Sequence, residues 1–255
     1  MARLPLEGVR ILDITQIWAG PYTTQLLADW GAEVIRVESI QITPIFTRVY
    51  SRERIPPEPG VWWLAHPDWE LGERRWNRYA LFNVHARNKL SMTLDLTRPE
   101  GTDIFNRLLR ISDVFLENNT PTTIEKLGLT YEALRQQKED IIVVRMPGFG
   151  LNGPYKNYRM MGNHAEALVG HTWVKGYADA DPSMVGSTTV GDGVSGLYAA
   201  FATMMALRHR RRTGKGQLVE LSQTEAMASF LPQQLLDYTM NGRVWRALGN
   251  RDPSM

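Results

Sequence analysis

Short β-branched runs alternate with amphipathic segments along most of the chain, and this alternation limits the possible folds more than any other feature. Strand-like runs occupy residues 9–14, 33–38, 92–96, 113–116 and 141–146, and helical spacing of apolar residues occupies 22–30, 102–111 and 131–137. Repeated strand–helix units require right-handed crossovers and produce a parallel sheet. The pattern therefore predicts an α/β fold, a Rossmann-like parallel sheet covered by helices, with its ligand at the carboxyl ends of the strands.

Residues 40–86 interrupt this alternation. The stretch is rich in proline, tryptophan and arginine and has no clean period. It is predicted to be an irregular insertion, either a partly ordered excursion from the sheet or a loop that covers a substrate or contacts a partner.

One acidic residue, Asp192, lies between Gly191 and Gly193 immediately before a long apolar helical pattern. Aspartate is a common helix N-cap, and the residues alone favour that role. The alternative is a reactive carboxylate, because flanking glycines let a bulky substrate approach and the helix supplies free N–H groups. The basic run 208–215 is expected to end the same helix, with Gly214 just after its last turn.

Composition excludes several classes of function. Twenty-nine basic and 27 acidic residues give a net charge of +2, too small a field to recruit nucleic acid. The absence of cysteine excludes disulfides and thiolate catalysis and is typical of a reducing cytoplasm. The five histidines lack metal-site spacing, so no metal is expected.

Two further classes are disfavoured by local sequence. The turn after the first strand reads TQIWAGP, which lacks the G-x-G-x-x-G pattern of a dinucleotide site. The N-terminus lacks the apolar region of a signal peptide, and the apolar stretch 196–207 is too short to span a bilayer. We therefore expect a cytoplasmic protein that does not bind membranes.

Five ordered blocks carry a more specific signal. They read PLEGVRILDITQIWAGPYTTQLLADWGAEVIRVE, NKLSMTLDLTRPEG, SDVFLENNTPTTIEKLGLTYEAL, GFGLNGPY and VGDGVSGLYAAFATMMALRHRRRTGKGQLVELS. In order and spacing they resemble the class III CoA-transferase family, which includes formyl-CoA, carnitine and bile-acid-inducible CoA-transferases. The resemblance implies that residues 1–255 form the large domain of that family. A C-terminal region corresponding to the family's small domain is not found in this sequence.

The resemblance implies that Asp192 is a nucleophile that moves CoA from an acyl-CoA thioester to a carboxylic acid. The reaction would pass through an aspartyl-CoA thioester, with CoA as a substrate and no permanently bound cofactor. Gly191 and Gly193 would position the acid, and backbone amides in 191–194 would stabilise the oxyanions. The CoA contacts it implies are Gln16, Ile17, Trp18, Ala19, Lys89, Leu94, Asn118, Asn119, Lys126 and Leu127.

Other readings stay open at this stage. Relatives that racemise 2-methylacyl-CoA use a histidine in a G-H-D block, and here the corresponding run is Gly162-Asn163-His164, with the histidine one place late. The chain could also be a CoA-binding fragment or subunit without activity of its own. The family forms interlocked dimers, so a homodimer or a heteromer with a related chain is expected. The sequence does not identify the acyl group.

Overall fold

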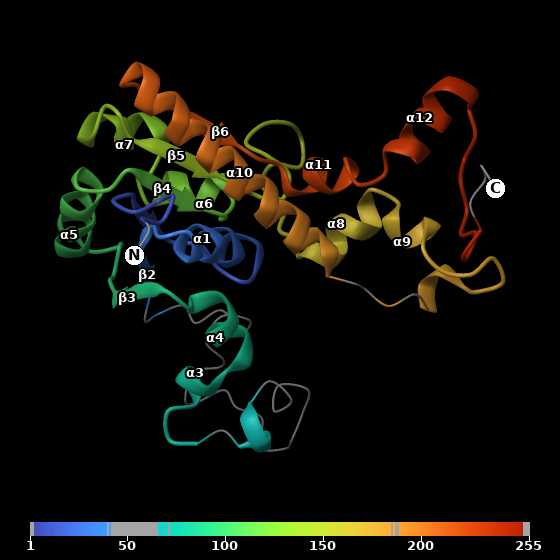
Figure 1. Ribbon diagram of the computed structural model, residues 1–255, viewed down its shortest axis with the longest axis horizontal. Coiled ribbons are helices and arrows are strands. Elements are labelled where there is room, and N and C mark those ends of the chain that lie inside the picture. Colours follow the sequence, from blue (N-terminus) through green and yellow to red (C-terminus); the bar gives the residue numbers. More distant parts are fainter. Residues whose placement is uncertain are drawn as a thin grey trace.

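The computed structural model describes residues 3–39, 41, 66–70, 72–184, 186 and 189–251. Its centre is one six-stranded, all-parallel sheet in the order β3-β2-β1-β4-β5-β6 (Figure 1). In chain order the strands are β1 (Arg10–Asp13), β2 (Glu33–Glu38), β3 (Lys89–Thr93), β4 (Val114–Glu117), β5 (Ile142–Arg145) and β6 (Leu218–Glu220). The predicted fold class, a Rossmann-like parallel sheet covered by helices, is confirmed.

Helices connect and cover the strands. Those packed on the sheet are α1 (Ala19–Asp29), α5 (Pro99–Arg110), α6 (Pro121–Lys126), α7 (Tyr131–Gln137) and α10 (Val190–Thr213). Beyond one end of the sheet lie α8 (Gly162–Leu168), α9 (His171–Val174), α11 (Gln223–Ala228) and α12 (Pro232–Asn241) (Figure 1). The connection from β2 to β3 contains α3 (Arg75–Arg78) and α4 (Ala80–Ala86), and short 3-10 turns occur at Pro67–Trp69 and Pro182–Met184.

Two apolar layers hold these helices on the sheet. Successive residues of a strand point to opposite faces, so Ile11 packs toward α1 and α10, whereas Leu12 packs toward α5, α6 and α7. Both faces are covered, which explains why β4 and β5 are buried at every position. A third, smaller apolar cluster joins α8, α10 and α11 around Ala165, Val194 and Met227.

The strand order reverses between β1 and β4. The chain passes from β1 to β2 on one side of β1, and it later returns to form β4 on the other side. This reversal opens a crevice at the carboxyl ends of β1 and β4. The turn after β1 and the turn after β4 meet there. Gln16 N–H donates to Asn118 Oδ1 at 2.8 Å, and Asn118 Nδ2 donates to the Gln16 carbonyl at 2.8 Å. Two segments far apart in sequence therefore form one wall.

Helix α10 links the sheet to the rest of the protein. It packs against α1 and β5 and continues to α8 and α11. Among the described residues it is the one helix long and apolar enough to cross a membrane, but half of its most apolar stretch is buried by these neighbours. Such burial identifies α10 as a core helix of the fold. It ends at Gly214, which has φ of 71°, as the sequence predicts.

Most predicted elements are confirmed, but several predicted boundaries need correction. Strands at 33–38 and 141–146 and the helix at 131–137 match to within a residue. Strand β3 begins at Lys89 rather than at residue 92, and helices α1 and α5 begin at Ala19 and Pro99, three residues before their predicted starts. The insertion at 40–86 is not irregular throughout, because α3 and α4 form its last part. Residues 40, 42–65 and 71 of this insertion lie outside the described residues.

Candidate active site

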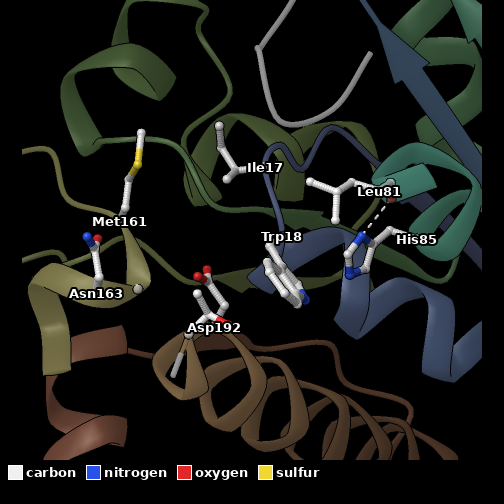
Figure 2. A pocket seen from close by; sticks show the side chains of 9 residues that line it. Ile17, Trp18, Leu81, His85, Met161, Asn163 and Asp192 are labelled. Atoms are coloured by element: carbon white, nitrogen blue, oxygen red, sulfur yellow. Dashed lines mark hydrogen bonds between the residues drawn. The ribbon is translucent and has the colours of Figure 1, made fainter. Parts of the chain in front are cut away.

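A cavity of about 230 Å³ lies at the carboxyl end of β1, beside the first turn of α10 (Figure 2). Four segments of the chain contribute to it. The turn after β1, helix α4, the start of α8 and the start of α10 supply its lining residues: Ile17, Trp18, Leu81, His85, Met161, Gly162, Asn163, Thr189 and Asp192. Three of these, Ile17, Trp18 and Asp192, are predicted site residues. The fold therefore brings the predicted nucleophile and part of the predicted CoA wall to one cavity.

Asp192 is the third residue of α10 and only 9% exposed. The N-cap position belongs to Thr189, so the N-cap role that the residues alone favoured is wrong. Its carboxylate instead accepts backbone N–H groups from Ala19, the first residue of α1, and Gly162, the first residue of α8. Three helix N-termini thus converge on one carboxylate, and each presents the positive end of its peptide dipoles. Any negative oxygen formed here is stabilised in the same way.

Opposing influences act on the pKa of Asp192. Burial raises it above the ordinary value of 3.8, because a desolvated carboxylate is costly. The N–H groups of Ala19 and Gly162 lower it in part, and the nearby Glu166 carboxylate raises it further. The net shift is upward, which makes the carboxylate a stronger base and a better nucleophile when it is ionised.

Glu166 lies behind the first turn of α10 and is 1% exposed. Its Oε1 accepts the Gly191 N–H at 3.3 Å, and its Oε2 lies 3.7 Å from His171 Nδ1. The Gly191 amide therefore already has an acceptor in the protein, and its predicted role in stabilising an oxyanion or positioning the acid stays a prediction. The amides directed at Asp192 come from Ala19 and Gly162, and sequence reasoning had not assigned Gly162 to the site.

The three glycines around Asp192 differ in whether the packing has room for a side chain at their position. A Cβ on Gly162 would lie 2.2 Å from Asp192 Oδ2, and one on Gly191 would lie 2.7 Å from the Gly162 carbonyl oxygen. No atom within 4 Å would meet a Cβ on Gly193. Gly162 and Gly191 thus permit the close approach of α8 and α10, whereas any role of Gly193 concerns space for a ligand.

The predicted CoA segment at 16–19 is a strained turn. Ile17 has φ of 69°, in the left-handed region that β-branched residues rarely adopt. This conformation places Ile17 and Trp18 on the cavity wall and directs the Ala19 N–H at Asp192. Because Asn118 bonds both the N–H and the carbonyl of Gln16, the amide side chain fixes this turn.

Two predicted CoA contacts have structural roles. The Lys89 side chain is 1% exposed, and its ammonium donates to the Pro21 carbonyl at 2.8 Å and to Thr24 Oγ1 at 2.7 Å, with Asp13 Oδ2 at 3.5 Å. All three donors are used inside the protein, which contradicts a phosphate contact. Burial lowers the pKa of Lys89 to about 8, although Asp13 opposes the shift. Leu94 packs in the core beneath α5, and its contact with CoA stays a prediction.

This placement predicts that Lys89→Met affects stability rather than CoA affinity. The substitution leaves the Asp13 carboxylate buried without its cation, and we expect a loss of about 3–5 kcal/mol in the free energy of unfolding. Urea denaturation measures the loss. Lys126→Met is the matched control, because Lys126 is exposed at the end of α6 and its removal should change stability by about 0.5 kcal/mol or less. Equal stability of both variants would contradict the structural role of Lys89.

The remaining predicted contacts lie around the turn after β4. The Asn119 N–H donates to the buried Glu117 carboxylate at 2.6 Å, and Arg145 Nε donates to the same carboxylate at 2.8 Å. Lys126 is exposed, and Leu127 is half-buried against the core beneath α6. Contacts of Asn119, Lys126 and Leu127 with CoA stay predictions.

Six lining residues were not among the predicted site residues, namely Leu81, His85, Met161, Gly162, Asn163 and Thr189. His85 is the most informative of them. Its ring Nδ1 is 2.8 Å from the Leu81 carbonyl oxygen, which requires the proton on Nδ1, and its ring lies 5.3 Å from that of Trp18. Burial, aided by the cations Lys89, Arg36 and Arg87, lowers the pKa of His85 to about 4 despite the hydrogen bond. Its position at the end of an aperiodic stretch gave no signal that it faces a cavity.

The shifted pKa of His85 predicts a loss of stability in acid. The unfolded chain binds a proton at His85 below about pH 6.5, whereas the folded protein binds it only near pH 4. Neutral His85 therefore makes its full contribution to the free energy of unfolding above pH 6.5, and this contribution declines as the pH falls toward 4. We expect the melting temperature of the wild type to fall more than that of His85→Phe when the pH is lowered from about 7.5 to about 4.5. A constant difference between the two proteins would contradict this titration.

The racemase alternative depends on a histidine that can reach the substrate. His164 instead caps α8, with its Nδ1 accepting the Met161 N–H at 3.0 Å, and Asn163 occupies the cavity wall. An asparagine amide is too weak a base to remove a proton from carbon at neutral pH, so this geometry does not favour proton transfer at the α-carbon.

Comparison with known proteins now places the chain. Residues 6–255 match the family model described as CoA-transferase family III. The chain belongs to this family. It is 34% identical over 252 residues to the succinyl-CoA–D-citramalate CoA-transferase of Chloroflexus aurantiacus, covering 98% of this chain and 57% of that protein. It is 31% identical over 255 residues to the succinate–glutarate CoA-transferase of Agrobacterium fabrum, covering 98% and 59%.

Solved structures of the family agree with the fold. A crystal structure of a CAIB/BAIF family protein from Brucella suis is similar with a TM-score of 0.82 at 31% identity, covering 99% of this chain and 62% of that one. The chain thus spans less than two thirds of the length of these family III relatives.

Proposed function

We propose that this family III protein transfers CoA from an acyl-CoA thioester to a carboxylic acid, with Asp192 as the nucleophile. The observation that carries the proposal is the Asp192 carboxylate on the wall of an apolar cavity, held by the N–H groups of Ala19 and Gly162. A carboxylate that only stabilised the fold would have no need to line a cavity large enough for an acyl group.

The reaction follows from this placement. The Asp192 carboxylate attacks the thioester carbonyl, and collapse of the tetrahedral intermediate breaks the C–S bond to give a mixed anhydride and CoA thiolate. The thiolate then attacks the aspartyl carbonyl, which releases the donor acid as a carboxylate and leaves an aspartyl-CoA thioester. The acceptor carboxylate attacks that thioester and expels CoA thiolate, which gives a second mixed anhydride. The thiolate then attacks the acceptor carbonyl of this anhydride, which produces the new acyl-CoA and regenerates the Asp192 carboxylate.

Each step forms a tetrahedral oxyanion next to Asp192. Backbone N–H groups that point at a position where charge develops need no reorganisation during the reaction, so they stabilise the transition state more than the ground state. In this proposal the Ala19 and Gly162 amides, at the first residues of α1 and α8, act on the oxyanions of the aspartyl carbonyl. Trp18 and Ile17 exclude water, which would otherwise hydrolyse the anhydride and the thioester.

The protein's partners belong to the same proposal. Two matched relatives are the alpha and beta subunits of the succinyl-CoA–L-malate CoA-transferase of Chloroflexus aurantiacus, with which the alignments cover 52% and 50% of those proteins. A dimer with a second copy or with a related chain is consistent with these names. A cytoplasmic location stays a prediction from the sequence.

The test is peptide mass spectrometry of the protein after incubation with a panel of acyl-CoA thioesters. A CoA-sized adduct on the peptide that contains Asp192 is the expected result, and the thioesters that produce it identify the donor. CoA binding without any adduct would instead support the alternative, a CoA-binding subunit or fragment that lacks activity of its own.

A further inference from the structure

The cavity next to Asp192 has an apolar wall. Ile17, Trp18, Leu81 and Met161 present hydrocarbon, aromatic and thioether surface to it (Figure 2). The side chains with polar atoms that line it, apart from Asp192, are His85, Asn163, Thr189 and Trp18, whose indole carries one N–H. Among the residues that the structure describes, no lysine or arginine lines this cavity.

His85 does not replace the missing cation. Its Nδ1 proton is directed to the Leu81 carbonyl, so the second ring nitrogen carries a lone pair and accepts hydrogen bonds. Burial of the ring lowers the pKa of His85 to about 4, so the imidazole is uncharged at neutral pH. A neutral imidazole in this tautomer repels a carboxylate oxygen and tolerates hydrocarbon.

Acyl groups with and without a second carboxylate therefore differ in the free energy of binding to this cavity. A dicarboxylic acid that reacts through one carboxyl group would bring its second carboxylate into this cavity, where no lysine or arginine of the described residues lines the wall to neutralise the charge, so its burial is disfavoured. An unbranched or aromatic hydrocarbon chain gains about fourfold in binding for each CH₂ group buried there.

We propose that the acyl group carried by this protein is that of a monocarboxylic acid with a hydrocarbon chain, and that His85 is a residue that determines this specificity. The inference rests on the proposed function, since it concerns the acyl group that Asp192 attacks. It separates this chain from relatives whose names specify succinate, citramalate, malate and glutarate, all of which are dicarboxylic acids.

The experiment compares two donors of equal carbon number, pentanoyl-CoA and glutaryl-CoA, with the full chain. Single-turnover formation of the CoA adduct on the Asp192 peptide is followed by mass spectrometry, a half-reaction that needs no acceptor. We expect wild type to react at least about tenfold faster with pentanoyl-CoA at subsaturating concentrations. Equal or faster reaction with glutaryl-CoA would overturn the inference and leave the proposed function intact. Failure of both donors, together with the wider panel, would remove the proposed function itself.

Two variants of His85 link the preference to this residue. His85→Lys places an ammonium on the wall, and we expect the ratio of the two rates to move toward glutaryl-CoA by about tenfold. His85→Phe keeps the aromatic contact with Trp18 without a charge or a lone pair, so its ratio should stay with pentanoyl-CoA. Circular dichroism establishes that each variant is folded. An unchanged ratio in folded His85→Lys would show that His85 does not determine the specificity.

Discussion

Asp192→Asn is expected to abolish CoA transfer, by at least about 10⁴-fold, while the fold is retained. The amide has the shape of the carboxylate and its oxygen still accepts an N–H group from α1 or α8, but it is too weak a nucleophile to attack a thioester. Because Asp192 has a pKa raised by burial, loss of its charge should change the free energy of unfolding by only about 1 kcal/mol.

Steady-state transfer assays, thermal melts and adduct mass spectrometry measure the three parts of this prediction. Asp192→Ala is the second variant, because it removes every side-chain atom that could react. Transfer at wild-type rates in either variant would remove Asp192 from the mechanism, whatever the family resemblance implies. A large loss of stability without loss of transfer per folded molecule would assign Asp192 a structural role.

Gly162→Ala is expected to reduce transfer at least about 100-fold and to lower the free energy of unfolding by about 1–3 kcal/mol. The new methyl group would lie 2.2 Å from Asp192 Oδ2 and 2.8 Å from Cγ, so the carboxylate must move away from the position set by α1 and α8. The same methyl group would lie 3.0 Å from the backbone nitrogen of Asp192, so the packing of α8 against α10 must also adjust.

The control for Gly162→Ala is Gly193→Ala, on the other side of the nucleophile. A Cβ at Gly193 meets no protein atom within 4 Å, so Asp192 keeps its position and any effect on transfer reports on space that the substrate needs. Measured melting temperatures distinguish catalytic loss from unfolding in both proteins. Undiminished transfer in Gly162→Ala would show that the contact between α8 and Asp192 is not required.

Local sequence predicted most of the secondary structure. Strand β2 at Glu33–Glu38 and helix α7 at Tyr131–Gln137 match their predicted ranges because period-2 and period-3.6 patterns arise from neighbouring residues alone. The same reasoning failed for α4, since Ala80–Ala86 is short and its apolar pattern has no surrounding context. It also misplaced the start of α10, because two glycines in the first turn resemble a loop.

The resemblance to the family selected Asp192 and the turn at 16–19, and the structure places both at one cavity. It did not separate ligand contacts from core residues. Lys89 and Leu94 are in the matched blocks, yet one forms a buried ion pair with Asp13 and the other packs under α5. A residue can be typical of a family because of the fold as well as because of the ligand, and burial distinguishes the two cases.

The sequence by itself determined the α/β class, most elements and the acid between two glycines. Only the tertiary structure decided that Asp192 receives N–H groups from α1 and α8, that Glu166 uses the Gly191 amide, and that His85 faces the cavity as a neutral ring. The reason is physical. Periodicity depends on adjacent residues, whereas a carboxylate's hydrogen-bond donors, burial and pKa depend on helix ends that only the strand order 3-2-1-4-5-6 and the packing of α8 bring together.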